Sequence, residues 1–120
     1  MVRGKLVPSR EQSRGATELL PVLMALADPA RLAIFQMLRQ REQCVCHLTD
    51  ATGLSQGTVS YHMGILKRAE LVCDRRDPND ARWVYYSLNP ACIEHLRHTL
   101  NTLLQPGAMD PTPADCGGRD

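Results

Sequence analysis

Residues 54–62, with the sequence LSQGTVSYH, decide the fold of this chain. Ser55 is a favoured residue for the N-cap of a helix, because its hydroxyl accepts a hydrogen bond from a backbone amide of the first turn. Val59, Met63 and Leu66 follow at the spacing of one helical face. The segment therefore predicts a helix that runs from Ser55 to about residue 69, with one apolar face and one polar face.

A second, shorter helix is predicted just before this one, over residues 44–52, and Gly53 is the type of residue that ends a helix. Two helices joined through Gly53 and Leu54 form a helix-turn-helix pattern. Further upstream, Asp28 followed by Pro29 predicts the start of another helix, which continues to about Gln40. Apolar residues from about position 17 predict one more helix before it.

Two extended segments follow, at residues 71–76 and 81–88, and the second is rich in residues that favour strands. Residues 77–80 join them as a turn, with Pro78 at its second position. We expect a β-hairpin with basic residues near its tip. A last helix begins at Asn89 and Pro90, and its apolar stripe has the spacing of a coiled coil, which predicts a dimer face formed by Ile93, Leu96, Leu100 and Leu103.

These elements define an α+β fold, mainly α: a winged helix-turn-helix with a β-hairpin wing and terminal helices that form a homodimer interface. We expect a flexible basic arm at 1–15, one domain at 16–105 and a disordered tail at 106–120. The net charge of +1 means that DNA binding would depend on local basic patches. No apolar stretch approaches the roughly 18 residues needed to span a bilayer, and no signal peptide is evident, so we expect a cytoplasmic protein without a membrane partner.

The chemistry of the chain is concentrated at Cys44 and Cys46, at the predicted start of the short helix. Five cysteines, an odd number, in a chain expected in the cytoplasm favour metal or redox chemistry over a disulfide framework. A helix N-terminus also lowers the pKa of a thiol. In a regular helix, with about 100° per residue, the two side chains would point to nearly opposite sides. We therefore expect a loose or unwound helix start if both bind one ion.

Three segments together resemble the ArsR/SmtB family of metal-sensing winged-helix repressors: residues 27–34 (ADPARLAI), 54–62, and 71–86 with its ending RWVYY. The resemblance covers about residues 17–104. It implies a homodimer that binds operator DNA and releases it when metal binds. Within the family, the Cys44 and Cys46 pair is similar to the motif of arsenite and antimonite responders.

In that motif a third cysteine follows three positions after the second, where this chain has Thr49. A third thiolate would have to come from Cys73, Cys92 or Cys116. The resemblance implies As(III) or Sb(III) as inducer, since thiolates are the soft ligands among side chains, and no organic cofactor. A site of only two thiolates should suit organoarsenicals with one carbon substituent at least as well.

The DNA partner implied by the resemblance is a double-stranded operator with an imperfect palindrome. The exposed face of the recognition helix should enter the major groove, where glutamine can read adenine. Tyr61 and His62 resemble the pair that contacts the groove in this family. The expected DNA-binding residues are Gln56, Thr58, Ser60, Tyr61, His62, Lys67, Arg75, Arg76 and Arg82.

The function predicted from the sequence is therefore a metalloid-responsive repressor and not an enzyme. Two alternatives keep the same fold: a thiol redox sensor, in which Cys44 and Cys46 are oxidised, and a zinc or cadmium sensor that adds His47 to the two thiols. A third alternative, a small thiol oxidoreductase, is disfavoured because Cys44 and Cys46 do not lie in the βαβ context that such enzymes have.

Overall fold

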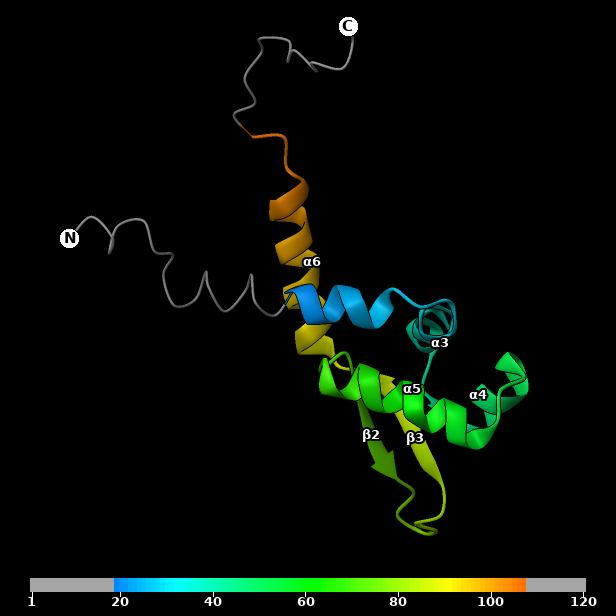
Figure 1. The fold of residues 1–120 in the computed structure, drawn as a ribbon. Helices are drawn as coiled ribbons and strands as arrows, with labels where there is room; N and C mark the ends of the chain where they lie inside the picture. Colours follow the sequence, from blue (N-terminus) through cyan, green and yellow to red (C-terminus); the bar gives the residue numbers. More distant parts are fainter. Residues whose placement is uncertain (1–18, 108–120) are drawn as a thin grey trace, which may run out of the picture.

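The computed structural model describes residues 19–107 (Figure 1). The expected basic arm, the start of the first helix before residue 19, most of the expected tail and Cys116 lie outside this range. Five helices and three strands follow one another: the helix Leu19–Leu26, then α3 (Pro29–Gln40), β1 (Gln43–Cys44), α4 (Val45–Thr52), α5 (Gln56–Arg68), β2 (Val72–Arg76), β3 (Val84–Leu88) and α6 (Pro90–Leu104).

The helix starts follow the capping residues predicted from the sequence. The Asp28 carboxylate accepts hydrogen bonds from the amides of Ala30, at 2.9 Å, and Arg31, at 3.1 Å, and so caps α3. The amide of Arg31 is the main cause that lowers the pKa of Asp28 below its ordinary value. Ser55 caps α5 by accepting from the Thr58 amide at 3.1 Å. Gly53 ends α4 with a φ of 73°, a left-handed conformation that favours glycine.

The core lies where α3, α4, α5 and the base of the hairpin meet. Ile34, Leu48, Val59 and Leu66 are completely buried there, and Val59 and Leu66 come from the apolar face predicted for α5. Leu71 closes the same cluster where the chain leaves α5. This core fixes α4 against α5 and so confirms the helix-turn-helix.

The sheet has a third strand that the sequence did not predict. Its order is β1-β3-β2 and all pairs are antiparallel, with Gln43 opposite Tyr86 and Cys44 opposite Tyr85. The short helix predicted from about Cys44 is confirmed: it begins at Val45, and Cys44 is its extended N-cap residue. Pairing with β3 holds these two residues in the sheet. A strand of two residues is too short to be predicted from its own sequence, because its conformation depends on this tertiary contact.

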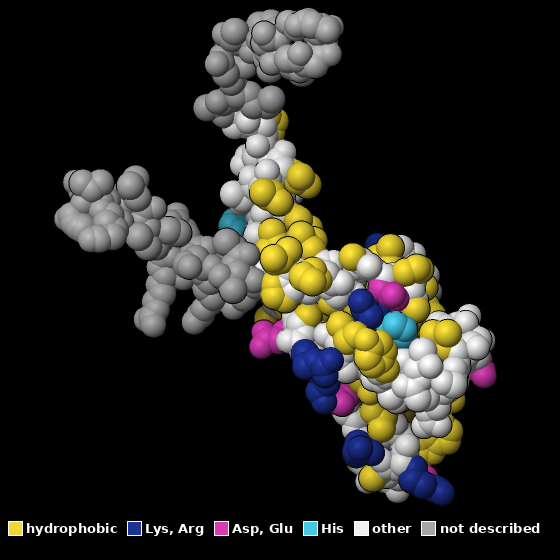
Figure 2. All heavy atoms as spheres, in the orientation of Figure 1, with side chains coloured by type: hydrophobic (Ala, Val, Ile, Leu, Met, Phe, Trp, Pro, Cys, Tyr) yellow, Lys and Arg dark blue, Asp and Glu magenta, His cyan; other side chains and the backbone are white. Residues whose placement is uncertain are grey.

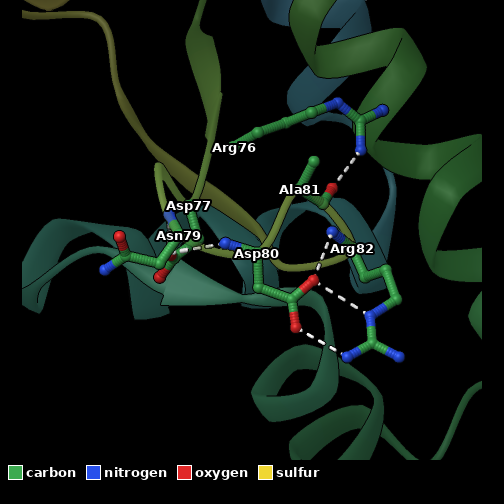
Figure 3. Close-up of polar contacts among 6 residues, drawn as sticks. All are labelled: Arg76, Asp77, Asn79, Asp80, Ala81 and Arg82. Carbon is green, nitrogen blue, oxygen red and sulfur yellow. Dashed lines mark hydrogen bonds and ion pairs between the residues drawn. The ribbon is translucent and has the colours of Figure 1, made fainter.

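The predicted start of the second wing strand, at residue 81, was wrong, because β3 begins at Val84. The loop 77–83 is closed by hydrogen bonds between the Asp77 amide and the Trp83 carbonyl, and between the Trp83 amide and the Asp80 carbonyl. Figure 3 shows the side chains of this loop folded onto the loop itself, with the Asp80 carboxylate accepting from the Arg82 amide and guanidinium. These local bonds compete with strand pairing and shorten the strand.

The last helix, α6, runs away from the sheet and passes beside the helix Leu19–Leu26 (Figure 1). It begins after Asn89 as predicted, but the Asn89 side chain makes no capping bond and donates instead to the Glu70 carbonyl at 3.0 Å. None of its residues is fully buried, and Leu103 is 61% exposed. Figure 2 shows apolar side chains gathered over this part of the molecule.

The conformation at Gly53 generates a test of the turn between the two helices. Gly53→Ala should lower the free energy of unfolding by about 1–2 kcal/mol, because an alanine is strained at positive φ even where its Cβ meets nothing within 4 Å. The matched control Gly57→Ala, inside α5, should raise it by roughly 0.5–1 kcal/mol through helix propensity. Urea denaturation at one protein concentration measures both; a Gly53→Ala protein as stable as the parent would contradict the assignment.

Candidate thiolate site and DNA interface

Cys44 joins the sheet to the helix-turn-helix. Its backbone pairs with Tyr85 of β3, and its side chain is the N-cap of α4, where Sγ accepts a hydrogen bond from the His47 amide at 3.4 Å. The residue is only 6% exposed. A backbone amide at the start of a helix is one of the donors that the helix itself leaves unpaired, and here the Cys44 sulfur accepts from it.

Cys46 lies in the first turn of α4 and is exposed. The Sγ atoms of Cys44 and Cys46 meet in a disulfide contact, and the two Cα atoms are 5.3 Å apart. The sequence predicted that both side chains can reach one ion only where the helix start is loose, and Cys44 is indeed extended and precedes the helical residues. Because Cys44 is extended and precedes the helix, the rule of 100° per residue does not apply between these two side chains. The sulfurs converge on an intact helix.

A third protein ligand is not placed beside the pair within residues 19–107. No group of three metal-ligating side chains occurs in that range. Cys73 lies on β2, which is separated from β1 by β3 and is therefore about 10 Å away across the sheet. Cys92 lies on α6, with its sulfur 4.0 Å from the Ala69 carbonyl oxygen. His47 contributes its backbone amide to the site, and its side chain is exposed.

Thr49, where the resembled motif has its third cysteine, lies next to the pair. Its hydroxyl donates to the Cys46 carbonyl at 2.8 Å. Cys46 and Thr49 line a hollow of about 240 Å³. Its opposite wall comes from the wing and from the first residue of α5. The residues that line it are Val45, Cys46, Thr49, Gln56, Arg82, Trp83 and Val84. The sequence did not predict this hollow, because the fold alone brings residues 82–84 to α4.

The second helix of the helix-turn-helix, α5, is the recognition helix, and it presents Gln56, Ser60 and Tyr61 to solvent. Tyr61 is 63% exposed. Thr58 is half-buried, and its hydroxyl accepts a hydrogen bond from Ser55 at 3.0 Å within the capping network. Of these candidates, the exposed three are the ones whose side chains are available to a groove.

His62 is half-buried, and its Nδ1 lies 3.1 Å from the Arg31 guanidinium. Arg31 also donates to the Ala25 carbonyl at 2.6 Å, so it connects the end of the first helix to the recognition helix. Sequence analysis did not identify Arg31, because a single arginine on a helix gives no sign of a partner 31 positions away.

The basic side chains expected at phosphates are mostly paired with carboxylates. Lys67 contacts Asp74 at 2.8 Å, and this hydrogen bond raises the pKa of Lys67. Arg75 binds Glu42 through two bonds of 2.8 Å and stacks on Tyr85 at 4.6 Å. Arg82 pairs with Asp80 at 2.7 Å. Arg76 donates to the Ala81 carbonyl at 2.7 Å (Figure 3).

The comparisons with known proteins identify the family. Residues 28–73 match the family described as "Bacterial regulatory protein, arsR family". The chain is 38% identical to the arsenical resistance operon repressor of Staphylococcus aureus over 86 residues, which are 72% of this chain and 80% of that protein. It is 40% identical to the HTH-type transcriptional repressor SmtB of Mycobacterium tuberculosis over 89 residues, which are 74% of this chain and 62% of that protein. This chain belongs to the arsR family of transcriptional regulators.

Solved structures support the same fold. A homodimeric winged helix-turn-helix DNA-binding domain from Mycobacterium bovis, a possible ArsR-family regulator, is 26% identical, with a TM-score of 0.64 over 82% of this chain and 89% of that one. The winged-helix prediction and the family resemblance are therefore confirmed. Between residues 19 and 107, no single helix is long and apolar enough to cross a membrane. The helix Leu19–Leu26 and α3 together have the necessary length and hydropathy, but the angle between them is 101°.

The pairing of Arg75 generates a test of the electrostatic state of the wing. Glu42→Gln should strengthen operator binding and make its salt dependence steeper, by about 0.9 in logarithmic slope for each added phosphate contact, because Arg75 is then free to neutralise DNA. Fluorescence anisotropy of labelled DNA at several salt concentrations measures both quantities. The pKa of Glu42 is held below its ordinary range by Arg75, so the carboxylate is charged near neutral pH and the comparison is valid there.

Glu94→Gln is the matched control, since Glu94 pairs with Arg97 at 2.6 Å on α6. It should leave the salt slope unchanged. Weaker binding or an unchanged slope for Glu42→Gln would show that Arg75 does not act on DNA from this position.

Proposed function

We propose that this protein is a metalloid-responsive repressor: a homodimer that binds a palindromic operator and leaves it when As(III) or Sb(III) binds the thiolates of Cys44 and Cys46. The observation that carries the proposal is the convergence of the two sulfur atoms at the N-cap of α4. Soft trivalent ions bind such a thiolate pair, whereas carboxylate or carbonyl ligands are absent from the pair itself. The similarity to an arsenical resistance operon repressor supports the same assignment. Such a repressor would act in the cytoplasm, where its operator is accessible.

Two short connections would carry an effect from the thiolates to DNA. The helix that Cys44 caps is followed, after Gly53 and Leu54, by the recognition helix. The strand that contains Cys44 pairs with β3 of the wing. An ion bound to Cys44 replaces the hydrogen bond that its sulfur accepts from the His47 amide, which weakens the cap of α4. Both DNA-binding elements are therefore one element away from the bound ion.

The proposed dimer would use the exposed apolar surface of the terminal helices. Leu20 and Met24 of the first helix are 60% and 62% exposed, and Leu104 at the end of α6 is 75% exposed. A monomer in water leaves these apolar side chains uncovered, and a second copy would bury them. The homodimeric neighbour from Mycobacterium bovis supports this arrangement.

The direct test measures release of operator DNA by fluorescence anisotropy with reduced protein. Arsenite or antimonite should release DNA from the parent protein, and Cys44→Ser/Cys46→Ser should remain bound at all concentrations that release the parent. Cys73→Ser is the matched control, because Cys73 is an exposed thiol on a different strand and should behave like the parent. If arsenite released the parent and Cys44→Ser/Cys46→Ser alike, the binding site would lie elsewhere in the protein. If only zinc or cadmium released the parent, the zinc or cadmium sensor would be favoured.

A redox sensor is the second candidate, favoured by the disulfide contact between Cys44 and Cys46. If oxidation regulates DNA binding, peroxide should lower operator affinity of the parent protein, a thiol reductant should restore it, and Cys44→Ser should abolish the response. An unchanged affinity in the oxidised protein, with the disulfide verified by mass, would exclude this candidate and leave the disulfide as a form that must be reduced before metalloid binding.

A further inference from the structure

The hollow beside Cys46 contacts the thiolate site, the recognition helix and the wing at once. Cys46 and Thr49 form its α4 wall, Gln56 contributes from α5, and Trp83 and Val84 form the wing wall. Cys44 does not line the hollow and is almost fully buried. Of the two cysteines only Cys46 borders the hollow, so a group bound to both sulfurs would be open to solvent on the side of Cys46.

The pair supplies two sulfur ligands, whereas trivalent arsenic forms three bonds. No third metal-ligating side chain between residues 19 and 107 lies close enough to complete the site. In a site of these two thiolates alone, the third bond goes to a group that arrives with the arsenic. Thr49 offers no thiolate at this position, and its hydroxyl hydrogen is already donated to the Cys46 carbonyl. The third substituent is thus the part of the ligand that meets the hollow.

Building on the proposed function, we infer that this hollow is a specificity pocket for the organic substituent of trivalent organoarsenicals, and that Trp83 is its specificity-determining residue. The hollow has a volume of about 240 Å³, and its apolar lining residues are Val45, Trp83 and Val84. Trp83 is 46% exposed, so it has aromatic surface that a bound ring covers. An aromatic substituent gains this burial, and the hydroxyl of arsenite does not.

The binding step balances without a change of oxidation state. An arsenical R–As(OH)2 reacts with the two thiols; two As–S bonds form, two As–O bonds break, and the two hydroxyl groups leave as water with the thiol protons. The disulfide contact between Cys44 and Cys46 must first be reduced, which takes two electrons from a phosphine or thiol reductant. The As–R bond stays intact, so R remains fixed next to Cys46.

The position of this pocket also gives the substituent a role in release. A ring in the hollow contacts Gln56, which is exposed at the first position of α5, and the wing residues Trp83 and Val84. It therefore acts on both DNA-binding elements directly, in addition to the effect of the ion on the α4 cap. Bulky substituents should release operator DNA at lower concentrations than arsenite.

The test compares arsenite, methylarsenite and phenylarsenite in operator release, with the full chain kept reduced by a phosphine. For the parent, phenylarsenite should act at a concentration about tenfold lower than arsenite, with methylarsenite between them. Trp83→Ala should abolish most of this advantage, and Trp83→Phe, which keeps an aromatic ring, should retain it. Equal potency of the three compounds on the parent, or an advantage unchanged in Trp83→Ala, would overturn the inference.

A second readout is independent of DNA and of folding effects in the Trp83 variants. Trp83 is the only tryptophan of the chain, so its emission reports the hollow alone. Phenylarsenite should shift the emission of the parent to shorter wavelength by excluding water from the ring, and should leave Cys44→Ser/Cys46→Ser unshifted. An unchanged emission with stoichiometric binding would overturn the pocket, whereas failure of every arsenical to bind would contradict the proposed function itself.

Thr49→Cys tests the same inference from the opposite side. A third thiolate completes the three sulfurs that arsenite accepts, but an organoarsenical has only two bonds to exchange. The variant should therefore favour arsenite over phenylarsenite relative to the parent. Thr52→Cys is the matched control, since Thr52 is on α4 but does not line the hollow, and its hydroxyl donates to the Leu48 carbonyl. An unchanged preference in Thr49→Cys would contradict the position of the third bond.

Discussion

The double role of Cys44 is the constraint on which the proposed function of this protein depends. Its backbone is paired with Tyr85 in the sheet, and its sulfur caps the first helix of the helix-turn-helix. A helix cap is a single local bond, typically worth about 1 kcal/mol, and it is lost when the capping atom finds another partner. Here the capping atom is a cysteine sulfur, which becomes a thiol when the disulfide contact with Cys46 is reduced. A thiophilic ligand can therefore compete with the cap, and the sheet keeps the residue in place while it does so.

The charges on the proposed DNA-binding surface also make DNA binding sensitive to a small structural change. Most of the basic groups near the hairpin are held by carboxylates, as Arg75 is by Glu42 and Lys67 by Asp74. Exposed ion pairs of this kind contribute little to stability, but each one withholds a charge from phosphate. A single subunit should thus bind DNA weakly, and the proposed function relies on two subunits at two half-sites for tight binding. A repressor whose affinity depends on both subunits binding at once is sensitive to a small structural change in either subunit.

The elements that could be predicted from the sequence are those whose signals are local. Asp28, Gly53 and Ser55 mark helix boundaries because each acts on its own backbone or on the next turn, and the structure confirms all three. Strand β1 could not be predicted, because only its pairing with β3, some forty residues later, makes it a strand. The convergence of Cys44 and Cys46 followed from that strand, since a regular helix would have separated them. The contact between Arg31 and His62 and the hollow beside Cys46 also join distant segments, so neither left a local signal.

The most direct measurement for the central claim is arsenic X-ray absorption on the reduced protein loaded with one equivalent of arsenite. The account predicts two sulfur neighbours and one oxygen neighbour for each arsenic in the parent protein, and the same two sulfurs in a triple variant in which Cys73, Cys92 and Cys116 are serine. Three sulfur neighbours in the parent that fall to two in the triple variant would contradict the two-thiolate site. An unchanged sulfur shell in Cys44→Ser/Cys46→Ser would contradict the site altogether.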